Sequence, residues 1–217
     1  MRRLLLRAGL ALPTLLLPAI SKAGAFEDWF EAAKRDNAGV IGSLLQRGFD
    51  INATEPERGD TALILAMRED AMKVVRLLLS SSNLDLEKRA RNGDNALMIA
   101  SWRGNLRAVE MLVEKGAEIN RPGWTPLHYA AGNGHLDVIR FLLEHHAYID
   151  AESPNRTTPL MMAAWRGHIL AVKLLLDEGA DASLKNDKGM DVIDFARHGQ
   201  HPDIVMGLEY RLKRKSP

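Results

Sequence analysis

A short apolar segment recurs along the chain at a nearly constant spacing, and this recurrence limits the possible fold more than any other feature. Each segment ends in an alanine, and successive alanines are 34, 30, 33 and 33 residues apart. A second apolar stretch and a polar loop follow each one. A period in this range predicts a solenoid, because one unit cannot bury its hydrophobic face without neighbours. The segments are TALILA (61–66), NALMIA (95–100), TPLHYA (125–130), TPLMMA (158–163) and DVIDFA (191–196).

The clearest unit, residues 125–150, has the features of a helical hairpin. Thr125 can cap a first helix with its hydroxyl, and Pro126 suits the first helical turn. Asn133-Gly134 then supplies residues typical of a tight turn. A second helix is predicted over residues 135–145, with a wide apolar stripe at helical spacing. The stripe consists of Leu136, Val138, Ile139, Leu142 and Leu143.

This unit and its copies resemble the ankyrin repeat. The resemblance rests on the pattern T-P-L-H-x-A, on G-H at the turn between helices and on G-A-D after the second helix, and it covers residues 27–209. It implies an all-α fold, an ankyrin-repeat solenoid of stacked helix-turn-helix units with short β-hairpin fingers. It also implies a non-enzymatic scaffold that mediates protein–protein interaction through its concave face.

The repeat pattern divides the chain into segments. We expect an ankyrin repeat domain over residues 26–209, made of an N-terminal cap (26–52), four full repeats (53–183) and a C-terminal cap (184–209). Residues 210–217 form a basic C-terminal tail, which is expected to be solvated or to contact an acidic surface weakly.

Residues 1–25 have the features of a secretory signal peptide. Three arginines precede an apolar run that is too short to span a bilayer, which argues against the alternative of a membrane anchor. Ala23-Gly24-Ala25 is typical of a cleavage site. Arg2-Arg3 also resembles a twin-arginine signal, but the usual preceding Ser or Thr is missing, which favours the general secretory (Sec) route. We therefore expect a bacterial periplasmic protein with no membrane contact after cleavage.

The composition excludes several kinds of chemistry. The chain has no cysteine, so disulfides, thiolate metal sites and acylated-cysteine anchors are impossible. Removal of residues 1–25 would leave 25 basic against 28 acidic residues, a net charge near −3. That balance gives no electrostatic reason to expect nucleic acid as a partner.

The histidines do not predict a catalytic or metal site. His128 lies in T-P-L-H, and His135 and His168 lie in the G-H turn, where the resemblance implies structural hydrogen bonds. No Asp or Glu completes a metal site by spacing, and no P-loop, Rossmann or G-x-S-x-G pattern occurs. We expect no cofactor, metal or catalytic residue. A hydrolase or metal-dependent enzyme on this frame, the remotest alternative, would need an extra domain or insertion.

The join before the third full repeat is short. Asn120 is followed only by Arg121 and Pro122 before Gly123, where ankyrin repeats normally place about five residues. The sequence predicts a truncated finger at this point. Drift in a loop that tolerates deletion explains the same observation without any function.

Tryptophan and arginine recur at positions that differ between repeats. Two Trp-Arg pairs begin two residues after the motif alanine, and Gly132-Asn133 holds the same place in the third repeat. The family implies that such positions line the concave face, and Trp and Arg are enriched in binding hot spots. The alternative is that each indole packs on a neighbouring repeat or stacks on arginine. The predicted protein-binding residues are Trp102, Arg103, Trp124, Asn133, Trp165 and Arg166.

These residues predict a hollow walled by the indoles of Trp102 and Trp165, with Trp124 at its edge. The expected partner is an unidentified protein, bound by a monomer of this chain. A structural module that acts through self-association is the alternative.

We predict cleavage after Ala25, because the basic start, the short apolar run and the small-residue site all favour it. Mass spectrometry of the exported protein should find Phe26 as its first residue. A full-length chain retained in the membrane would contradict this prediction.

Overall fold

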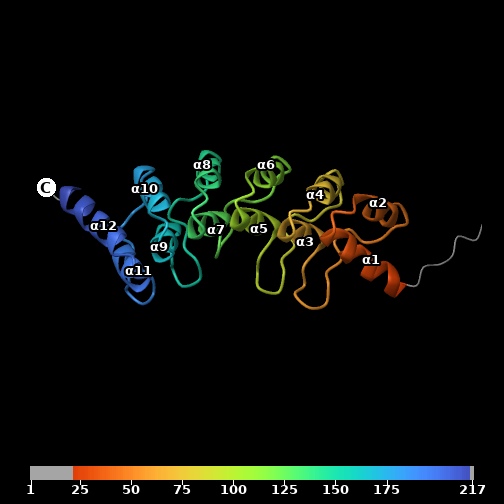
Figure 1. The fold of residues 1–217 in the computed structure, drawn as a ribbon, viewed down its shortest axis with the longest axis horizontal. Coiled ribbons are helices and arrows are strands. Elements are labelled where there is room, and N and C mark those ends of the chain that lie inside the picture. The colour runs from red at the N-terminus through yellow and green to blue at the C-terminus, as the bar shows by residue number, and fades with distance from the viewer. Residues whose placement is uncertain (1–21, 216–217) are drawn as a thin grey trace, which may run out of the picture.

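The structure is a computed structural model that describes residues 22–215, and within that range it contains twelve helices and no strand. The helices follow one another as pairs joined by a tight turn, and a longer loop connects each pair to the next (Figure 1). The helices are α1 (Lys22–Lys34), α2 (Ala38–Gln46), α3 (Ala62–Arg68), α4 (Met72–Leu79), α5 (Ala96–Arg103), α6 (Leu106–Glu114), α7 (Pro126–Gly132), α8 (Leu136–Glu144), α9 (Pro159–Trp165), α10 (Ile169–Asp177), α11 (Val192–His198) and α12 (Pro202–Lys215).

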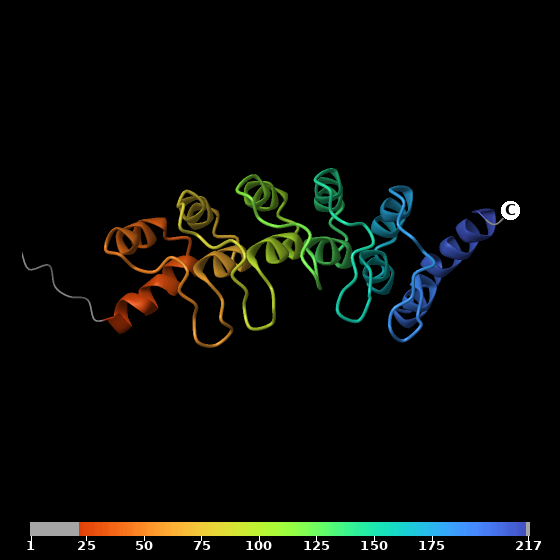
Figure 2. The ribbon, with the colours of Figure 1, turned by 180° about the vertical axis from the view of Figure 1, so that it is seen from behind.

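The pairs stack side by side into an elongated array with two rows of helices. Figures 1 and 2 show one row made of the first helix of each pair, α1 to α11, which we call the inner row. The second helices, α2 to α10, form the outer row. The long loops extend beyond the inner row and end as projecting fingers. The predicted all-α solenoid of helix-turn-helix units is confirmed.

The inner helices begin where the sequence supplies a cap. A polar residue precedes each inner helix from α3 onward. At α3, α5, α9 and α11 its side chain accepts a hydrogen bond from a backbone N–H of the first turn, which would otherwise lack a partner, whereas at α7 Thr125 bonds to the ring of His128. The capping residues of the full repeats are Thr61, Asn95, Thr125 and Thr158, and Asp191 caps α11 in the same way.

The core runs without interruption along the array. The five motif alanines are all buried in the contacts between successive inner helices, where a small side chain lets two helix backbones approach closely. The apolar stripe of each outer helix covers this row, and Leu142 of α8 is fully buried. Each repeat therefore completes its hydrophobic burial only against its neighbours.

The fingers are present, but they are not regular β-hairpins. A backbone hydrogen bond closes four of the five long loops: Glu55 to Asp60, Ala90 to Asp94, Ser153 to Thr157 and Asn186 to Met190. In residues 22–215 the only strand-like pairing is one antiparallel bridge, Thr54 with Thr61. The expectation of β-hairpins is thus corrected to loops with a closed base, which are too short to form a ladder.

The remaining long loop is shorter, as the sequence predicts. It spans residues 115–125, three residues fewer than the loop of residues 145–158 in the next repeat. Figures 1 and 2 show that this loop ends well before the tips of the fingers beside it. We call it the short loop.

The predicted segment boundaries differ from the helix ends at both caps. Helix α1 begins at Lys22, so the boundary expected after Ala25 lies inside a helix, and Ala25 packs against the core. Most of the predicted signal peptide, residues 1–21, lies outside the described residues. In residues 22–215, no helix has the length and apolar character required to cross a membrane.

Helix α12 continues without interruption to Lys215, so the segment predicted as a basic tail, residues 210–217, is helical as far as residue 215. Arg211 of this segment pairs with Asp177 at 2.6 Å and donates to the carbonyl of Leu176 at 2.8 Å. These contacts dock the last helix against α10. The basic residue is therefore part of the packed cap and not of a solvated tail.

We predict that His146→Gly raises the free energy of unfolding by about 0.5–1 kcal/mol. His146 follows α8 with a φ of 65°, at the place where Gly116 and Gly179 have φ of 96° and 100°. This left-handed backbone is strained for a side chain with a Cβ. Urea denaturation of both proteins tests the prediction, and a less stable glycine variant would contradict it.

Candidate functional site

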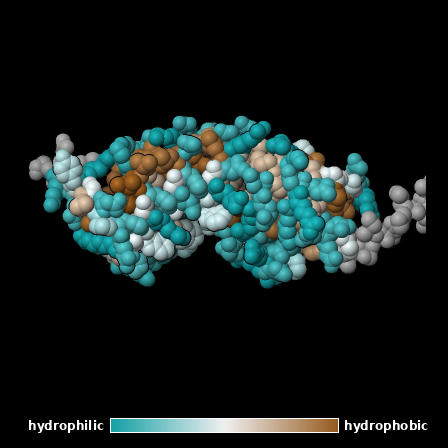
Figure 3. Space-filling view, viewed as in Figure 1, coloured by the Kyte–Doolittle hydropathy of each residue, from teal (hydrophilic) through white to brown (hydrophobic). Residues whose placement is uncertain are grey.

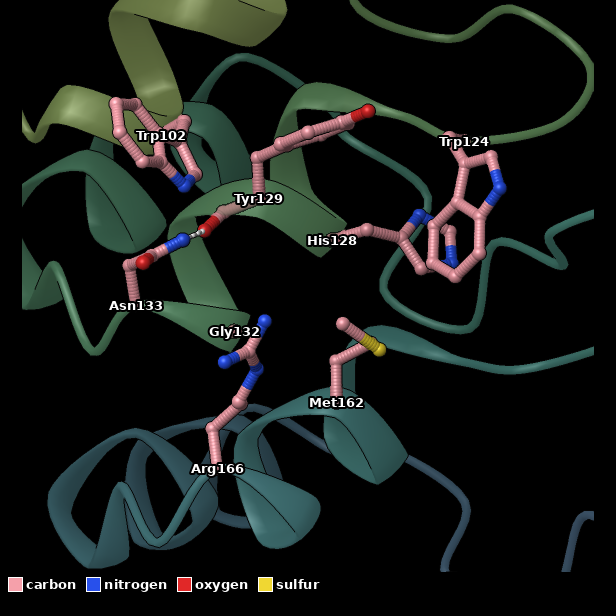
Figure 4. Close-up of a pocket in the computed structure, with 8 residues that line it drawn as sticks. All are labelled: Trp102, Trp124, His128, Tyr129, Gly132, Asn133, Met162 and Arg166. Atoms are coloured by element: carbon pink, nitrogen blue, oxygen red, sulfur yellow. Dashed lines mark hydrogen bonds between the residues drawn. The ribbon is translucent and has the colours of Figure 1, made fainter. Parts of the chain in front are cut away.

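The structure has a hollow of about 200 Å³ over the middle of the inner row. Its floor comes from α7, and its walls come from α5 on one side and α9 on the other (Figure 4). Trp124, from the short loop, closes one end. The lining residues are Trp102, Trp124, His128, Tyr129, Gly132, Asn133, Met162 and Arg166.

The floor exists because four residues of the third repeat share one face of α7 and its C-cap. Residues 128, 129, 132 and 133 have the i, i+1, i+4, i+5 spacing that puts side chains on one side of a helix. Gly132 lies at the place that Trp102 and Trp165 occupy in the flanking repeats, so no large side chain fills the space above the helix. The hollow therefore exists because Gly132 leaves open the space between Trp102 on one side and Met162 with Arg166 on the other.

Four of the six predicted residues lie together at the hollow: Trp102, Trp124, Asn133 and Arg166. Figure 4 shows Trp102 beside Asn133, and Arg166 pointing from α9 toward Gly132. The structure does not bring Arg103 or Trp165 to the lining, although both are exposed. The prediction of a hollow between the indoles of Trp102 and Trp165 is corrected, since the second wall is Arg166 with Met162.

Trp165 does not line the hollow, but it contacts Arg166, which does. The guanidinium carbon of Arg166 is 5.0 Å from the centre of the Trp165 ring, which is within the range of a cation–π contact. The structure therefore contains the stacking that was the alternative explanation for this indole. The same contact also holds Arg166 beside the hollow.

Four lining residues were not among the predicted binding residues: His128, Tyr129, Gly132 and Met162. His128 had an expected structural role and Gly132 was placed level with the tryptophans, whereas Tyr129 and Met162 were not singled out. Both occupy the fifth position of the T-P-L-x-x-A motif, whose apolar residues follow the pattern of a buried helix and so do not indicate a surface site. The signal that would have found them is the helical spacing, because Met162 and Arg166 lie four residues apart on α9 as Tyr129 and Asn133 do on α7.

Tyr129 is held in place by a carboxylate from the preceding repeat. Its hydroxyl donates to Oδ1 of Asp94, a buried residue at the base of the finger before α5. Burial and the adjacent carboxylate raise the pKa of Tyr129 well above its ordinary value. The side chain therefore remains a neutral hydrogen-bond donor, and its ring presents a fixed surface to the hollow.

His128 is buried, and both of its ring nitrogens have partners. Nδ1 accepts from the backbone N–H of Thr125 at 3.1 Å, and Nε2 donates to the carbonyl of Thr157 in the next finger at 2.9 Å. Burial lowers the pKa of His128 to about 4, so the imidazole is neutral at neutral pH. The expected structural role of this histidine is confirmed.

Two histidines that immediately precede second helices, His135 before α8 and His201 before α12, fix the backbone that carries the indoles. His135 Nε2 donates to the carbonyl of Trp102 at 2.9 Å, and His201 makes the same bond to Trp165 at 3.1 Å. A Cβ on Gly104 would lie 2.4 Å from the ring of His135, so this turn requires glycine. The ends of α5 and α9 are thereby locked to the following repeats.

The hollow carries one positive charge. Arg166 is its only lining residue that is charged at neutral pH, because His128 is neutral. Over residues 22–215, no carboxylate lies within ion-pair distance of Arg166. No group of three or more His, Asp or Glu side chains in that range could hold a metal ion. The arrangement can bind an apolar group and an anion together.

Comparison with known proteins assigns the family. The family model for ankyrin repeats (3 copies) matches residues 29–122 and 120–186. The chain is an ankyrin-repeat protein. Ankyrin repeats generally mediate protein–protein interaction, and the paired inner and outer helices described above are the repeats that the family model detects.

Relatives of this ankyrin-repeat protein are much longer than the matched part. The ankyrin repeat and KH domain-containing protein mask-1 of Caenorhabditis elegans is 33% identical over 206 residues, which cover 81% of this chain and 8% of mask-1. The B-cell lymphoma 3 protein homolog of Mus musculus is 33% identical over 160 residues, 70% of this chain and 36% of that protein. Glycerophosphocholine phosphodiesterase GDE1 of Candida albicans is 31% identical over 118 residues, 52% of this chain and 10% of the enzyme.

We predict that acid destabilises the fold through His128. The unfolded chain binds a proton near pH 6.5, whereas the folded chain does so only near pH 4. The free energy of unfolding should therefore fall between these values, by on the order of 3 kcal/mol from this group.

Urea denaturation of the wild-type protein and of His128→Gln at neutral pH and near pH 4.5 tests this prediction. The variant should be less stable at neutral pH but should lose less stability on acidification. His145→Gln, at an exposed position on α8's C-cap, is the matched control. An equal loss in wild type and His128→Gln would contradict the assignment.

Proposed function

We propose that this ankyrin-repeat protein is a non-enzymatic scaffold that binds a protein partner through the inner-row face of the solenoid. The observation that carries the proposal is the preformed hollow, whose side chains are fixed by partners outside it. Asp94 holds Tyr129, Thr157 holds His128, and Trp165 stacks on Arg166. A site that is ordered before binding loses little conformational entropy when it closes on a partner.

Indoles and arginine are the residue types that carry most binding energy in protein interfaces. Trp102 is 44% exposed and Trp165 is 37% exposed, which is unusual for side chains of this size unless a partner covers them. Their exposure on one face of the array supports an interface there.

The proposed setting is the bacterial periplasm, reached by the Sec route. The basic start and short apolar run of residues 1–25 support export. Cleavage after Ala25 would leave Phe26 at the new terminus, where its ring packs on Phe30 with centroids 4.8 Å apart. The aromatic contacts of the N-terminal cap would therefore survive cleavage.

Self-association is a second candidate, favoured by a different surface. Figure 3 shows hydrophobic side chains gathered around α8 and α10. Tyr148, Ile169 and Leu170 are among the most exposed large apolar residues. Light scattering across a range of concentrations distinguishes a monomer from a dimer that buries this surface.

The main proposal predicts that Trp102→Ala and Trp165→Ala each weaken partner binding by about 2 kcal/mol or more. Both variants should remain folded, whereas Leu142→Ala should lose about 2–5 kcal/mol of stability through a core cavity. The partner would be captured from a periplasmic extract and its affinity measured with each variant. Thermal denaturation provides the folding control.

Two results would contradict the proposal. If both tryptophan variants unfold as readily as Leu142→Ala, the indoles are part of the core. If both remain folded and bind the captured partner at full strength, the interface lies on the fingers or on the outer row.

A further inference from the structure

The third full repeat departs from its neighbours in two ways that meet at the hollow. Its preceding loop is short, and α7 carries Gly132 where the flanking inner helices carry tryptophan. We propose that this repeat is a seat for one anionic peptide segment of the partner. The segment crosses the solenoid through the gap left by the short loop and places one apolar side chain in the hollow. This inference rests on the proposed protein-binding function and specifies the chemistry of the partner.

The gap is a fixed feature, because the short loop is fastened to the preceding finger. Arg121 Nη1 donates to Oε2 of Glu87 at 2.9 Å, and the backbone N–H of Glu118 donates to Oε1 of the same carboxylate at 2.8 Å. The short loop is also bonded to the following long loop, because Asn120 donates to the carbonyl of His146 at 2.7 Å and accepts from the backbone N–H of Tyr148 at 2.8 Å. It is therefore held on both sides. Figure 3 shows an indentation in the lower edge of the molecule near the middle of the array, where Figure 1 places the short loop.

The volume of the hollow indicates a single side chain. About 200 Å³ lies below the roughly 300–1,000 Å³ of typical small-molecule pockets. Trp102, Trp124 and Met162 supply apolar surface, and Met162 can adjust its flexible side chain to the shape of the guest. The occupant is therefore a leucine-sized or aromatic anchor that projects from a longer chain.

The positive charge of Arg166 indicates that the bound peptide segment is anionic. Arg166 has a guanidinium with no carboxylate partner in residues 22–215, and its face is already taken by the Trp165 ring. Its N–H edges remain free to make paired hydrogen bonds with a carboxylate beside the hollow. An acidic residue one or two positions from the apolar anchor satisfies this geometry.

The net negative charge of a groove at the N-terminal end disfavours continuation of the segment along the array in that direction. A groove between α1 and the first finger is lined by five carboxylates and three basic side chains. This groove would repel an acidic chain that continued toward the N-terminus. The carboxylates are Glu27, Glu31, Glu55, Glu57 and Glu69.

The test uses the four tryptophans of the chain as separate reporters. Each indole N–H of the 15N-labelled protein gives its own NMR signal, which single Trp→Phe variants assign. The probe is an acetylated and amidated peptide of about eight residues, long enough to extend roughly 25 Å. It has a central leucine flanked by glutamates, and the matched control peptide has glutamines in their place.

The acidic peptide should shift the signals of Trp102 and Trp124 in a saturable manner and leave that of the fully buried Trp29 unchanged. Arg166→Gln should weaken its binding by roughly tenfold. Arg103→Gln removes the same charge from an exposed position outside the hollow and should have little effect. Added salt should weaken binding of the acidic peptide more than that of the control.

Equal binding of the two peptides, equal effects of the two arginine variants, or no saturable shift would overturn the inference. These results are distinguishable from failure of the protein-binding function. If Trp102→Ala and Trp165→Ala still abolish binding of a captured partner while the acidic peptide shows no preference, the scaffold function stands and the anionic assignment is wrong.

Discussion

The burial of each helical pair against the next is the interaction on which the rest of the structure depends. A pair such as α7 and α8 carries an apolar stripe that it cannot cover alone, and its motif alanine lets the adjacent inner helices approach closely. Hydrogen bonds between repeats then fix how each helical pair is positioned on its neighbour, among the positions that hydrophobic packing alone would allow. His135 and His201 reach back to the carbonyls of Trp102 and Trp165, so the orientation of each repeat is set by a side chain of a later one.

The hollow is a product of this stacking. Its floor and its two walls come from three successive inner helices, so no single repeat contains a site. The surface side chains also depend on other repeats, since Tyr129 is positioned by Asp94 from the finger before α5 and His128 by Thr157 from the finger before α9. A change in the packing between repeats would therefore alter the shape of the hollow even if every lining residue were retained.

The sequence predicted the repeats, the short loop and four of the eight lining residues, because these follow from periodicity and from departures from it. From the sequence alone, stacking of an indole on arginine was only an alternative. The sequence could not decide that Trp165 adopts it and that Arg166 forms the wall, since side-chain direction at a helix C-terminus depends on the neighbouring repeat. The end of α12 was also missed. Its basic residues suggested a solvated tail, whereas Arg211 finds Asp177 on α10, a partner 34 residues away in sequence.

The hydrogen bonds of the Glu87 carboxylate affect where the array of repeats begins to unfold. Its carboxylate accepts from Asn95 as well as from the short loop, so it joins the loops before α5 and after α6. In a linear array, stability is approximately the sum of unit and interface terms, and opening begins where those terms are weakest. Because Glu87 links the central loops, local unfolding starts at the terminal caps. The central repeats then unfold together as one cooperative unit. The terminal repeats can thus fluctuate, or exchange their amide hydrogens rapidly, while the surface between them stays intact.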